Sequence, residues 1–230
     1  MPLILQIETA TQTCSVAVAK DGQLLSCIER TDKNIHASNI TLFIEQALAK
    51  AGKKPSDLDA VAVSMGPGSY TGLRIGVSTA KGLCYALDIP LIAINTLEAM
   101  ASGFKSRCFS VQPNTLFCPM IDARRMEVYC AFFDNELNPA VPTAAVIVDE
   151  NSFSDLLNSN LVYFFGDGAM KCETALGKHL NARLMDDFEN SAKDLTLPAL
   201  EKFTAGQFVD VAYFEPYYLK DFIVGKKKQD

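Results

Sequence analysis

The sequence predicts an α/β protein built from two similar halves, each with a mixed sheet flanked by helices. An apolar strand, a hairpin and an amphipathic helix open the chain, and the same order of elements begins again near residue 116. In both halves an apolar strand ends in an acidic residue, which is Glu8 in the first half and Asp122 in the second. Internal duplication is a signal of the whole fold, and a chance likeness between two β-meanders is the alternative.

Three antiparallel strands are predicted at the start of the first half. Leu3 to Ile7 is a short apolar run, which is typical of a buried strand. The runs at 14–19 and 24–28 flank Asp21-Gly22, a dipeptide that is a strong signal for a hairpin turn. The chain therefore opens with a three-stranded meander.

A helix is predicted from about residue 37 to residue 50. Its apolar residues recur at helical spacing, and Gly52 follows where the helix should end. The apolar stripe consists of Ile40, Phe43, Ile44, Ala47 and Leu48.

A glycine-rich turn over residues 66–76 is predicted to connect a strand at 58–63 to a helix at 71–87. Gly66 and Gly68 can take a positive φ without steric cost. The turn before a helix often receives a phosphate, because the first N–H groups of the helix point outward. The glycine spacing matches neither a P-loop nor the GxGxxG of dinucleotide-binding folds, so a tight structural turn is the simpler interpretation.

The helix after this turn has a face of small residues. Ser69 or Thr71 can cap its start with a side-chain oxygen. Gly72, Gly76 and Ala80 recur every four residues and therefore share one face. Because glycine inside a helix costs about 0.5–1 kcal/mol relative to alanine, a packing reason is expected. Packing inside the chain and packing against a partner both remain open.

The second half repeats the plan of the first. Leu116 to Ile121 is an apolar strand that ends in Asp122, and Glu127 to Phe133 corresponds to the second strand of the first half. Asp134-Asn135 stands where Asp21-Gly22 stood. A helix, a strand, a glycine turn and a further helix are then expected at 153–157, 161–165, 166–168 and 170–176.

Two lobes and a tail are expected from this organisation. The first lobe comprises residues 1–105 and the second comprises residues 106–190. Ser, Gly, Lys, Asn and Pro cluster near the boundary between them. A late helix at about 191–208 is expected to pack back on the first lobe, and residues 209–230 form a C-terminal strand or tail.

The composition favours a cytoplasmic globular protein. The chain has 230 residues, 49% of them hydrophobic, and a net charge of −6 without a broad basic surface for nucleic acid. Its seven cysteines form no CxxC pair, which is typical of a reduced compartment. The first residues lack the pattern of a signal peptide, and no apolar run reaches the ~18 residues of a membrane span.

The sequence offers weak candidates for metal or anion binding. His36 and His179 lie far apart, and neither has a second ligand at metal-binding spacing. Arg124 and Arg125 follow Asp122 and can bind an anion through paired N–H groups. A local ion pair with a neighbouring carboxylate is the simpler interpretation of these arginines.

The duplicated order of elements resembles the actin, Hsp70 and sugar-kinase superfamily. This resemblance implies a duplicated actin-like (ribonuclease H-like) two-lobed fold. It also implies that the acidic residue ending the first strand lies where nucleotide and magnesium bind in those proteins. Candidate nucleotide or phosphate contacts are then Glu8, Thr9, Thr11, Ser69 and Thr71. Glu8 is a poor candidate, because its longer side chain would displace a metal-bound water.

Five segments together resemble the TsaB (YeaZ) family over essentially the whole chain. They are residues 4–11, 66–76, 89–96, 121–125 and 215–220. The resemblance implies a non-catalytic subunit that helps to make N6-threonylcarbamoyladenosine in tRNA. It implies as partners a TsaD-like catalytic paralogue, a TsaE-like ATPase and, for the chain alone, a second copy. tRNA would be bound through the complex, and a nucleotide would lie only at the complex interface.

The resemblance also implies an interface and argues against a metal site. The two helices at about 37–50 and 71–87 would pack against the partner. Their expected contact residues are Ile40, Phe43, Ile44, Ala47, Gly72, Leu73, Gly76 and Ala80. Two metal-binding histidines of the catalytic paralogues correspond to Thr96 and Met100 here. A hydroxyl and a thioether cannot replace two imidazoles, so neither a catalytic residue nor a metal ligand is expected.

A small-molecule kinase or ATPase of the same fold is the alternative. It would need an acid that organises a metal and a base in the cleft between the lobes. Glu8 is a poor candidate for the first role, and the sequence offers no candidate for the second. A metallopeptidase would require ligands that the sequence does not contain.

Overall fold

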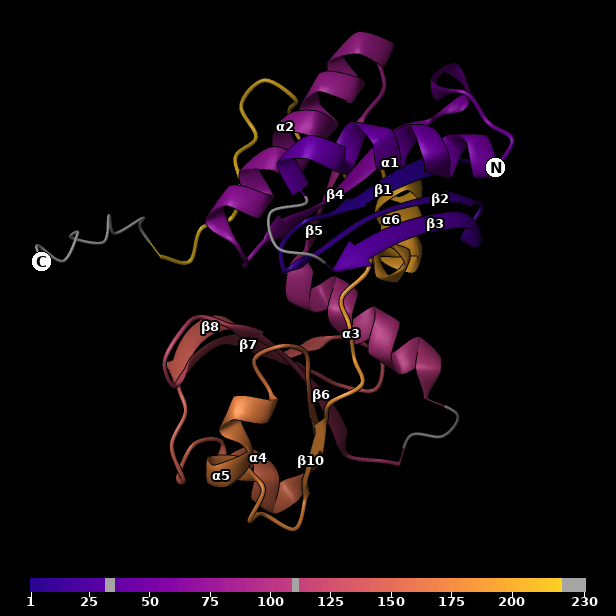
Figure 1. The fold of residues 1–230 in the computed structure, drawn as a ribbon. Helices are drawn as coiled ribbons and strands as arrows, with labels where there is room; N and C mark the ends of the chain where they lie inside the picture. The colour runs from indigo at the N-terminus through magenta and orange to yellow at the C-terminus, as the bar shows by residue number, and fades with distance from the viewer. Residues whose placement is uncertain (32–35, 109–111, 221–230) are drawn as a thin grey trace, which may run out of the picture.

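Two lobes, each built on a five-stranded mixed sheet, make up the computed structural model (Figure 1). The structure describes residues 1–31, 36–108 and 112–220. The strand order is β3-β2-β1-β4-β5 in lobe 1 and β10-β9-β6-β7-β8 in lobe 2. In both sheets the first strand of the lobe pairs antiparallel with the second and parallel with the fourth, so the predicted duplication is confirmed.

The sheet of lobe 1 follows the predicted meander. Its strands are β1 (Leu3–Glu8), β2 (Thr13–Lys20), β3 (Gln23–Thr31), β4 (Ala60–Gly66) and β5 (Leu91–Asn95). Asp21 and Gly22 connect β2 to β3 with φ values of 51° and 75°. Such positive φ values are those of the tight turn that the dipeptide predicts.

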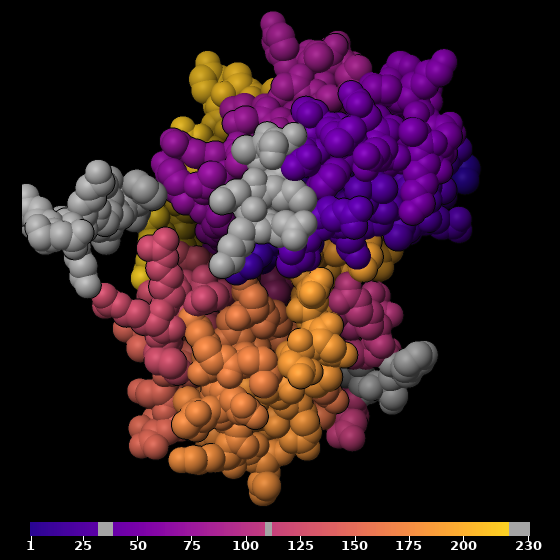
Figure 2. Space-filling view, in the orientation of Figure 1, coloured from indigo at the N-terminus to yellow at the C-terminus, as the bar shows by residue number. Residues whose placement is uncertain are grey.

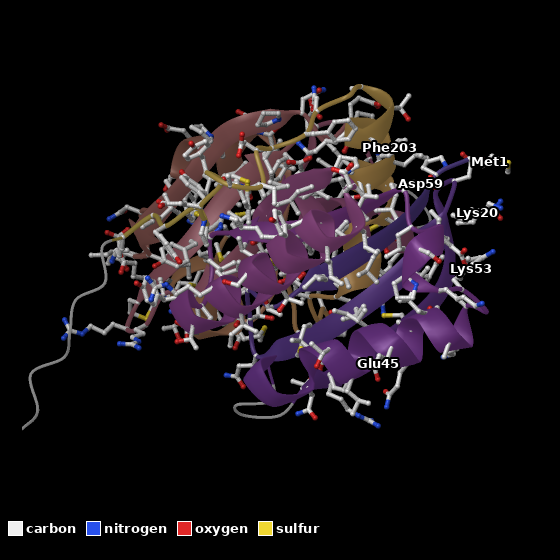
Figure 3. All side chains as sticks on the ribbon, turned by 90° about the horizontal axis from the view of Figure 1, so that it is seen from above. Met1, Lys20, Glu45, Lys53, Asp59 and Phe203 are labelled. Carbon is white, nitrogen blue, oxygen red and sulfur yellow. The ribbon has the colours of Figure 1, made fainter. Side chains whose placement is uncertain are left out.

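Helices cover both faces of this sheet. α1 (His36–Lys50) and α2 (Tyr70–Leu87) lie side by side over one face, as Figure 3 shows from above. α3 (Thr96–Arg107) and α6 (Thr196–Thr204) lie over the other face, so this late helix packs on lobe 1. A short turn, η1 (Pro55–Asp57), precedes β4.

Lobe 2 repeats the sheet with shorter helices. Its strands are β6 (Thr115–Asp122), β7 (Glu127–Phe133), β8 (Pro139–Ile147), β9 (Leu161–Phe165) and β10 (Ala182–Met185). Its helices are α4 (Ser154–Ser159), η2 (Met170–Cys172) and α5 (Glu173–Leu176). All seven cysteines of the chain are unpaired.

An aromatic core joins the two lobes. α3 contributes Leu97, Met100 and Phe104, which pack against Phe117 and Phe165 of lobe 2. The rings of Phe104 and Phe165 stack with their centroids 4.1 Å apart. Figure 2 shows the lobes as two masses that meet at a waist, and α3 lies in this waist in Figure 1. The two lobes therefore share one closely packed apolar contact.

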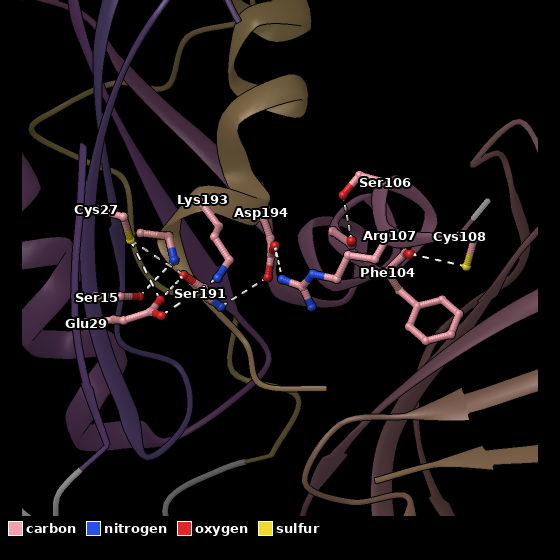
Figure 4. A network of polar contacts seen from close by, with 12 residues as sticks. Ser15, Cys27, Glu29, Phe104, Ser106, Arg107, Cys108, Ser191, Lys193 and Asp194 are labelled. Atoms are coloured by element: carbon pink, nitrogen blue, oxygen red, sulfur yellow. Dashed lines mark hydrogen bonds and ion pairs between the residues drawn. The ribbon is translucent and has the colours of Figure 1, made fainter. Parts of the chain in front are cut away.

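The chain returns from lobe 2 to lobe 1 through residues 186–195, here called the return segment, which includes η3 (Ala192–Leu195). Arg107 at the end of α3 donates a hydrogen bond to Asp194 at 2.7 Å (Figure 4). Ser191 Oγ donates to Glu29 of β3, also at 2.7 Å. These polar contacts anchor the return segment to the face of lobe 1 that α3 covers.

The C-terminal strap, Val209–Lys220, crosses from lobe 1 towards lobe 2. The N–H of Tyr217 donates to the carbonyl of Met65 at 2.7 Å. Lys220 then forms an ion pair with Glu127 of lobe 2. Val209 makes an isolated bridge with β5, which is the part of the expected C-terminal strand that lies within the described residues. Residues 221–230 of that expected tail lie outside them.

No helix in the described part of the chain combines the length and the apolar character that crossing a bilayer requires.

Candidate functional site

The glycine turn is closed by the chain itself. Ser69 is the N-cap of α2 and accepts a hydrogen bond from the N–H of Gly72 at 3.2 Å. Its own N–H donates to the carbonyl of Ala10 at 2.7 Å. A Cβ at Gly68 would overlap Ala10, so glycine is needed for this close approach. The backbone of Ala10 therefore lies against the turn where a bound phosphate was considered.

The small-residue face of α2 packs inside the chain. Thr9 Oγ1 donates to the carbonyl of Gly72 at 2.8 Å, and a Cβ at Gly76 would overlap the same oxygen. Of the two interpretations left open by the sequence, internal packing is therefore the one observed. Thr9 is itself fully buried and has no room to move aside. Only glycine therefore fits at position 76 of α2.

The residues expected to contact a partner are also packed inside the chain, so that expectation is corrected. All eight side chains or glycines proposed for it are buried within lobe 1: Ile40, Phe43, Ile44, Ala47, Gly72, Leu73, Gly76 and Ala80. They face β1, β2 and β4, because α1 and α2 use their apolar faces to cover the sheet. A partner that docks on this helix pair meets its opposite face.

That opposite face carries exposed apolar side chains. Its exposed residues include Thr41, Leu42, Glu45, Gln46 and Ala49 on α1 and Thr71, Arg74, Ser78, Gly82 and Tyr85 on α2. Leu42 is 45% exposed and Tyr85 is 86% exposed. Glu45 points away from the sheet in Figure 3. Below, these ten residues are called the outer helix face.

Glu8, the last residue of β1, is fully buried and lies beside Asn190 of the return segment. The N–H of Ala10 donates to its Oε1 at 2.6 Å, whereas Oε2 has no hydrogen-bond partner among the described residues. Asn190 lies beside it, and neither atom of its amide makes a hydrogen bond of ordinary geometry within the described chain. Burial raises the pKa of Glu8 from 4.5 to about 7. This carboxyl therefore titrates near neutral pH.

A cavity of about 200 Å³ opens beside Glu8 at the waist. It is lined by the polar residues Thr11, Thr13, Thr31, Asp167, Glu189 and Asn190, with Met100 and Phe188 as apolar walls. No Lys, Arg or His is among the described residues that line it. A cavity with two carboxylates and no cation disfavours a polyphosphate.

The five candidate nucleotide contacts occupy different surroundings. Glu8 and Thr9 are buried in contacts within lobe 1. Thr11 lines the cavity at the waist. Ser69 and Thr71 lie at the exposed start of α2.

The two positions at which the resemblance implies histidines in the catalytic paralogues are buried here. Thr96 Oγ1 and Ser64 Oγ share a hydrogen bond of 2.7 Å. Met100 lies in the aromatic core between the lobes. Within the described residues, no three His, Cys, Asp or Glu side chains converge as a metal site.

The arginines after β6 are exposed and do not make the local ion pairs that the sequence suggested. Lys171 pairs with Asp122, and Lys220 pairs with Glu127. The backbone N–H of Arg124 donates to Asp122 at 2.8 Å. These distant lysines could not be found from the sequence, because 49 and 93 residues separate the partners.

Comparison with known proteins decides the family. The model of the family "TsaD: tRNA N6-adenosine threonylcarbamoyltransferase" matches residues 27–187. The tRNA threonylcarbamoyladenosine biosynthesis protein TsaB of Escherichia coli (strain K12) is 31% identical over 97% of this chain and 97% of its own length. The chain belongs to the TsaB family.

Solved structures agree with the TsaB assignment. YeaZ from Pseudomonas aeruginosa superposes with a TM-score of 0.82 at 26% identity, covering 95% of this chain and 100% of that one. An activator of 2-hydroxyisocaproyl-CoA dehydratase from Clostridium difficile matches with a TM-score of 0.53 at 11% identity over 89% of this chain and 97% of that one, which shows a shared fold alone. This TsaB-family chain therefore has the duplicated actin-like fold that the sequence predicted.

Proposed function

We propose that the chain is a non-catalytic subunit in the synthesis of N6-threonylcarbamoyladenosine in tRNA. In this proposal it binds a TsaD-like catalytic paralogue, works together with a TsaE-like ATPase, and forms a homodimer when alone. tRNA is bound through the complex. Membership of the TsaB family supports the pathway, because its relatives are named for tRNA threonylcarbamoyladenosine biosynthesis.

Several features of the waist favour a supporting role over phosphoryl transfer. The glycine turn is filled by Ala10, and the cavity beside Glu8 is lined by carboxylates. Thr96 and Met100, at the positions where the resemblance implies metal ligands in the paralogues, are buried and carry no imidazole. The chain would act by stabilising the active arrangement of its partner.

The observation that carries the docking proposal is the outer helix face. Leu42 and Tyr85 are large apolar side chains left exposed on two adjacent helices. Tyrosine is enriched among the residues that dominate binding energy at interfaces. The residues around Leu42 and Tyr85 are polar or small. A polar rim of this kind surrounds the core of many transient interfaces.

Replacing Tyr85 by Glu is expected to weaken binding of the TsaD-like protein at least about tenfold. The new carboxylate would have to lose its water on docking, which costs free energy that the tyrosine ring does not. Isothermal titration calorimetry with the purified partner measures the change, and light scattering measures the loss of the homodimer.

Leu180→Glu is the matched control for this variant. Leu180 is 90% exposed but lies on lobe 2, away from α1 and α2. Its replacement should leave both affinities unchanged. Equal weakening by both variants, or none with Tyr85→Glu, would mean that the outer helix face is not the docking surface.

A further inference from the structure

The cavity at the waist contains a buried polar side chain without a partner. Asn190 is 5% exposed and lies beside Glu8, and neither its amide oxygen nor its amide nitrogen makes a hydrogen bond of ordinary geometry within the described residues. Buried polar groups in native proteins are nearly always satisfied by protein, water or ligand. Asn190 lines the cavity, so a ligand bound there can reach its amide.

The charge of the cavity restricts what that partner is. Asp167 from lobe 2 and Glu189 from the return segment both line it. Asp167 Oδ1 accepts the N–H of Asp122 at 3.0 Å, which is an uncharged donor. Neither carboxylate forms an ion pair with a described residue under the usual distance limit. Among the described residues Lys171 is close enough to act on Asp167, but its ion pair is with Asp122, so the two cavity carboxylates have no ion-pair partner of their own.

The cations near the waist already have other partners. Lys171 pairs with Asp122 and donates a hydrogen bond to the carbonyl of Glu127. Arg107 forms an ion pair with Asp194 of the return segment. Its guanidinium also lies over the ring of Phe188, 4.6 Å from the ring centre. Within the part of the chain that the structure describes, no cation is left to pair with Asp167 or Glu189.

The size and the donor set favour an organic cation. About 200 Å³ corresponds to only about six water molecules, which is below the range of most sites for larger ligands. An ammonium group has three N–H donors, which match threonine hydroxyls, an amide oxygen and carboxylates. The described residues show no cluster of acidic, His or Cys side chains suited to a metal ion.

We propose that the cavity at the waist binds a small protonated amine, held by Asp167 and Glu189 at its rim and by Asn190 at its base. The ligand bridges the two lobes, because Asp167 belongs to lobe 2 and Thr13 to lobe 1. The site is separate from the outer helix face and does not depend on the proposed partner.

Calorimetric titration of the full chain with putrescine dihydrochloride at neutral pH tests this site. A dissociation constant on the order of 1 mM is expected for so small a ligand. 1,4-Butanediol has the same length without the charge, and potassium chloride matches the ionic strength. Neither should bind if the ammonium group is what the cavity recognises.

Two variants connect the binding to the named residues. Asp167→Asn keeps an oxygen that can accept from Asp122 but removes the charge, and it should weaken putrescine binding at least about tenfold. Asn190→Leu removes an amide that makes no hydrogen bond in the described chain, so the fold should persist while binding is lost. Asp155→Asn on the exposed surface of α4 is the control and should bind as the parent does.

Three results would overturn the proposal. The first is no binding of putrescine up to about 10 mM by a folded chain. The second is equal binding of 1,4-butanediol or potassium. The third is equal weakening by Asp167→Asn and Asp155→Asn, which would indicate attraction to the overall negative charge. Thermal unfolding of each variant confirms that the chain measured is folded.

Discussion

Replacing Glu8 by Gln is expected to stabilise the folded chain by about 3 kcal/mol at about pH 8. At that pH the buried carboxyl of the parent is mostly ionised in the fold, and its Oε2 has no hydrogen bond of ordinary geometry to a described residue. Glutamine carries no charge and keeps an oxygen that can accept from the N–H of Ala10. The free energy of unfolding in urea measures the difference.

The pH dependence of the parent follows from the same carboxyl. Burial raises the pKa of Glu8 from 4.5 in the unfolded chain to about 7 in the fold. The folded state therefore binds this proton more tightly, and the stability it contributes is complete below about pH 4.5 and lost as pH rises through about 7. Burial also raises the pKa of Asp194 from 3.8 to about 6. The free energy of unfolding therefore also falls as pH rises through about 6.

Glu8→Gln should remove the part of this loss that belongs to Glu8. Near pH 4.5 the variant and the parent should have similar stability, because the parent carboxyl is then neutral. Glu136→Gln, at an exposed position of lobe 2, is the control and should change stability little at either pH. A variant that is less stable than the parent at pH 8 would show that the ionised carboxyl has a favourable partner.

Replacing Gly76 by Ala is expected to destabilise the chain by about 2 kcal/mol. The new Cβ would overlap Thr9 Oγ1, and that side chain is fixed by its hydrogen bond to Gly72 inside the core. Neither the strand end nor the helix can move away without disturbing the packing of lobe 1. Chemical unfolding measures the loss.

Gly82→Ala on the same helix is the matched control. Gly82 is exposed, and a Cβ there would meet no atom within 4 Å. This variant should be more stable by about 0.5–1 kcal/mol, because alanine loses less conformational entropy in a helix. Thr9→Ala should reduce the cost of Gly76→Ala, which a double-mutant cycle detects. Equal effects at positions 76 and 82 would contradict the close contact.

The repeated local patterns made the fold predictable. Asp21-Gly22 fixed the first hairpin, and the match between the strands after Glu8 and Asp122 indicated the duplication. The strands expected at 127–133 and 161–165 are β7 and β9 with the same bounds. The alternation of apolar and polar residues, the turn residues and the helical spacing of apolar residues are local signals. These elements could therefore be predicted from short stretches of sequence.

Elements whose pattern is set by tertiary contacts were missed. α3 gives no amphipathic signal because most of its length is buried between the two lobes, and the boundary was placed over its end. β8 contains Pro139 and Pro142, which are unusual in a strand and fit its place at the sheet edge. β5 and β10 are short strands that were not delimited.

The site was predicted less well than the fold. The sequence indicates that α1 and α2 each have an apolar face, but it cannot say whether that face meets the sheet or a partner. Gly76 contacts Thr9, and Glu8 lies near Asn190, only because distant segments meet in the fold. Both contacts join residues more than 60 positions apart, so no local pattern reveals them.

Reconstituted tRNA modification tests the central claim most directly. The TsaD-like and TsaE-like proteins of the same genome are supplied with threonylcarbamoyl-adenylate, ATP and a substrate tRNA, with and without this chain. We expect N6-threonylcarbamoyladenosine to form only when the chain is added, and the chain without the TsaD-like protein to form none. Full product in its absence, or product from the chain alone, would contradict the proposal of a required non-catalytic subunit.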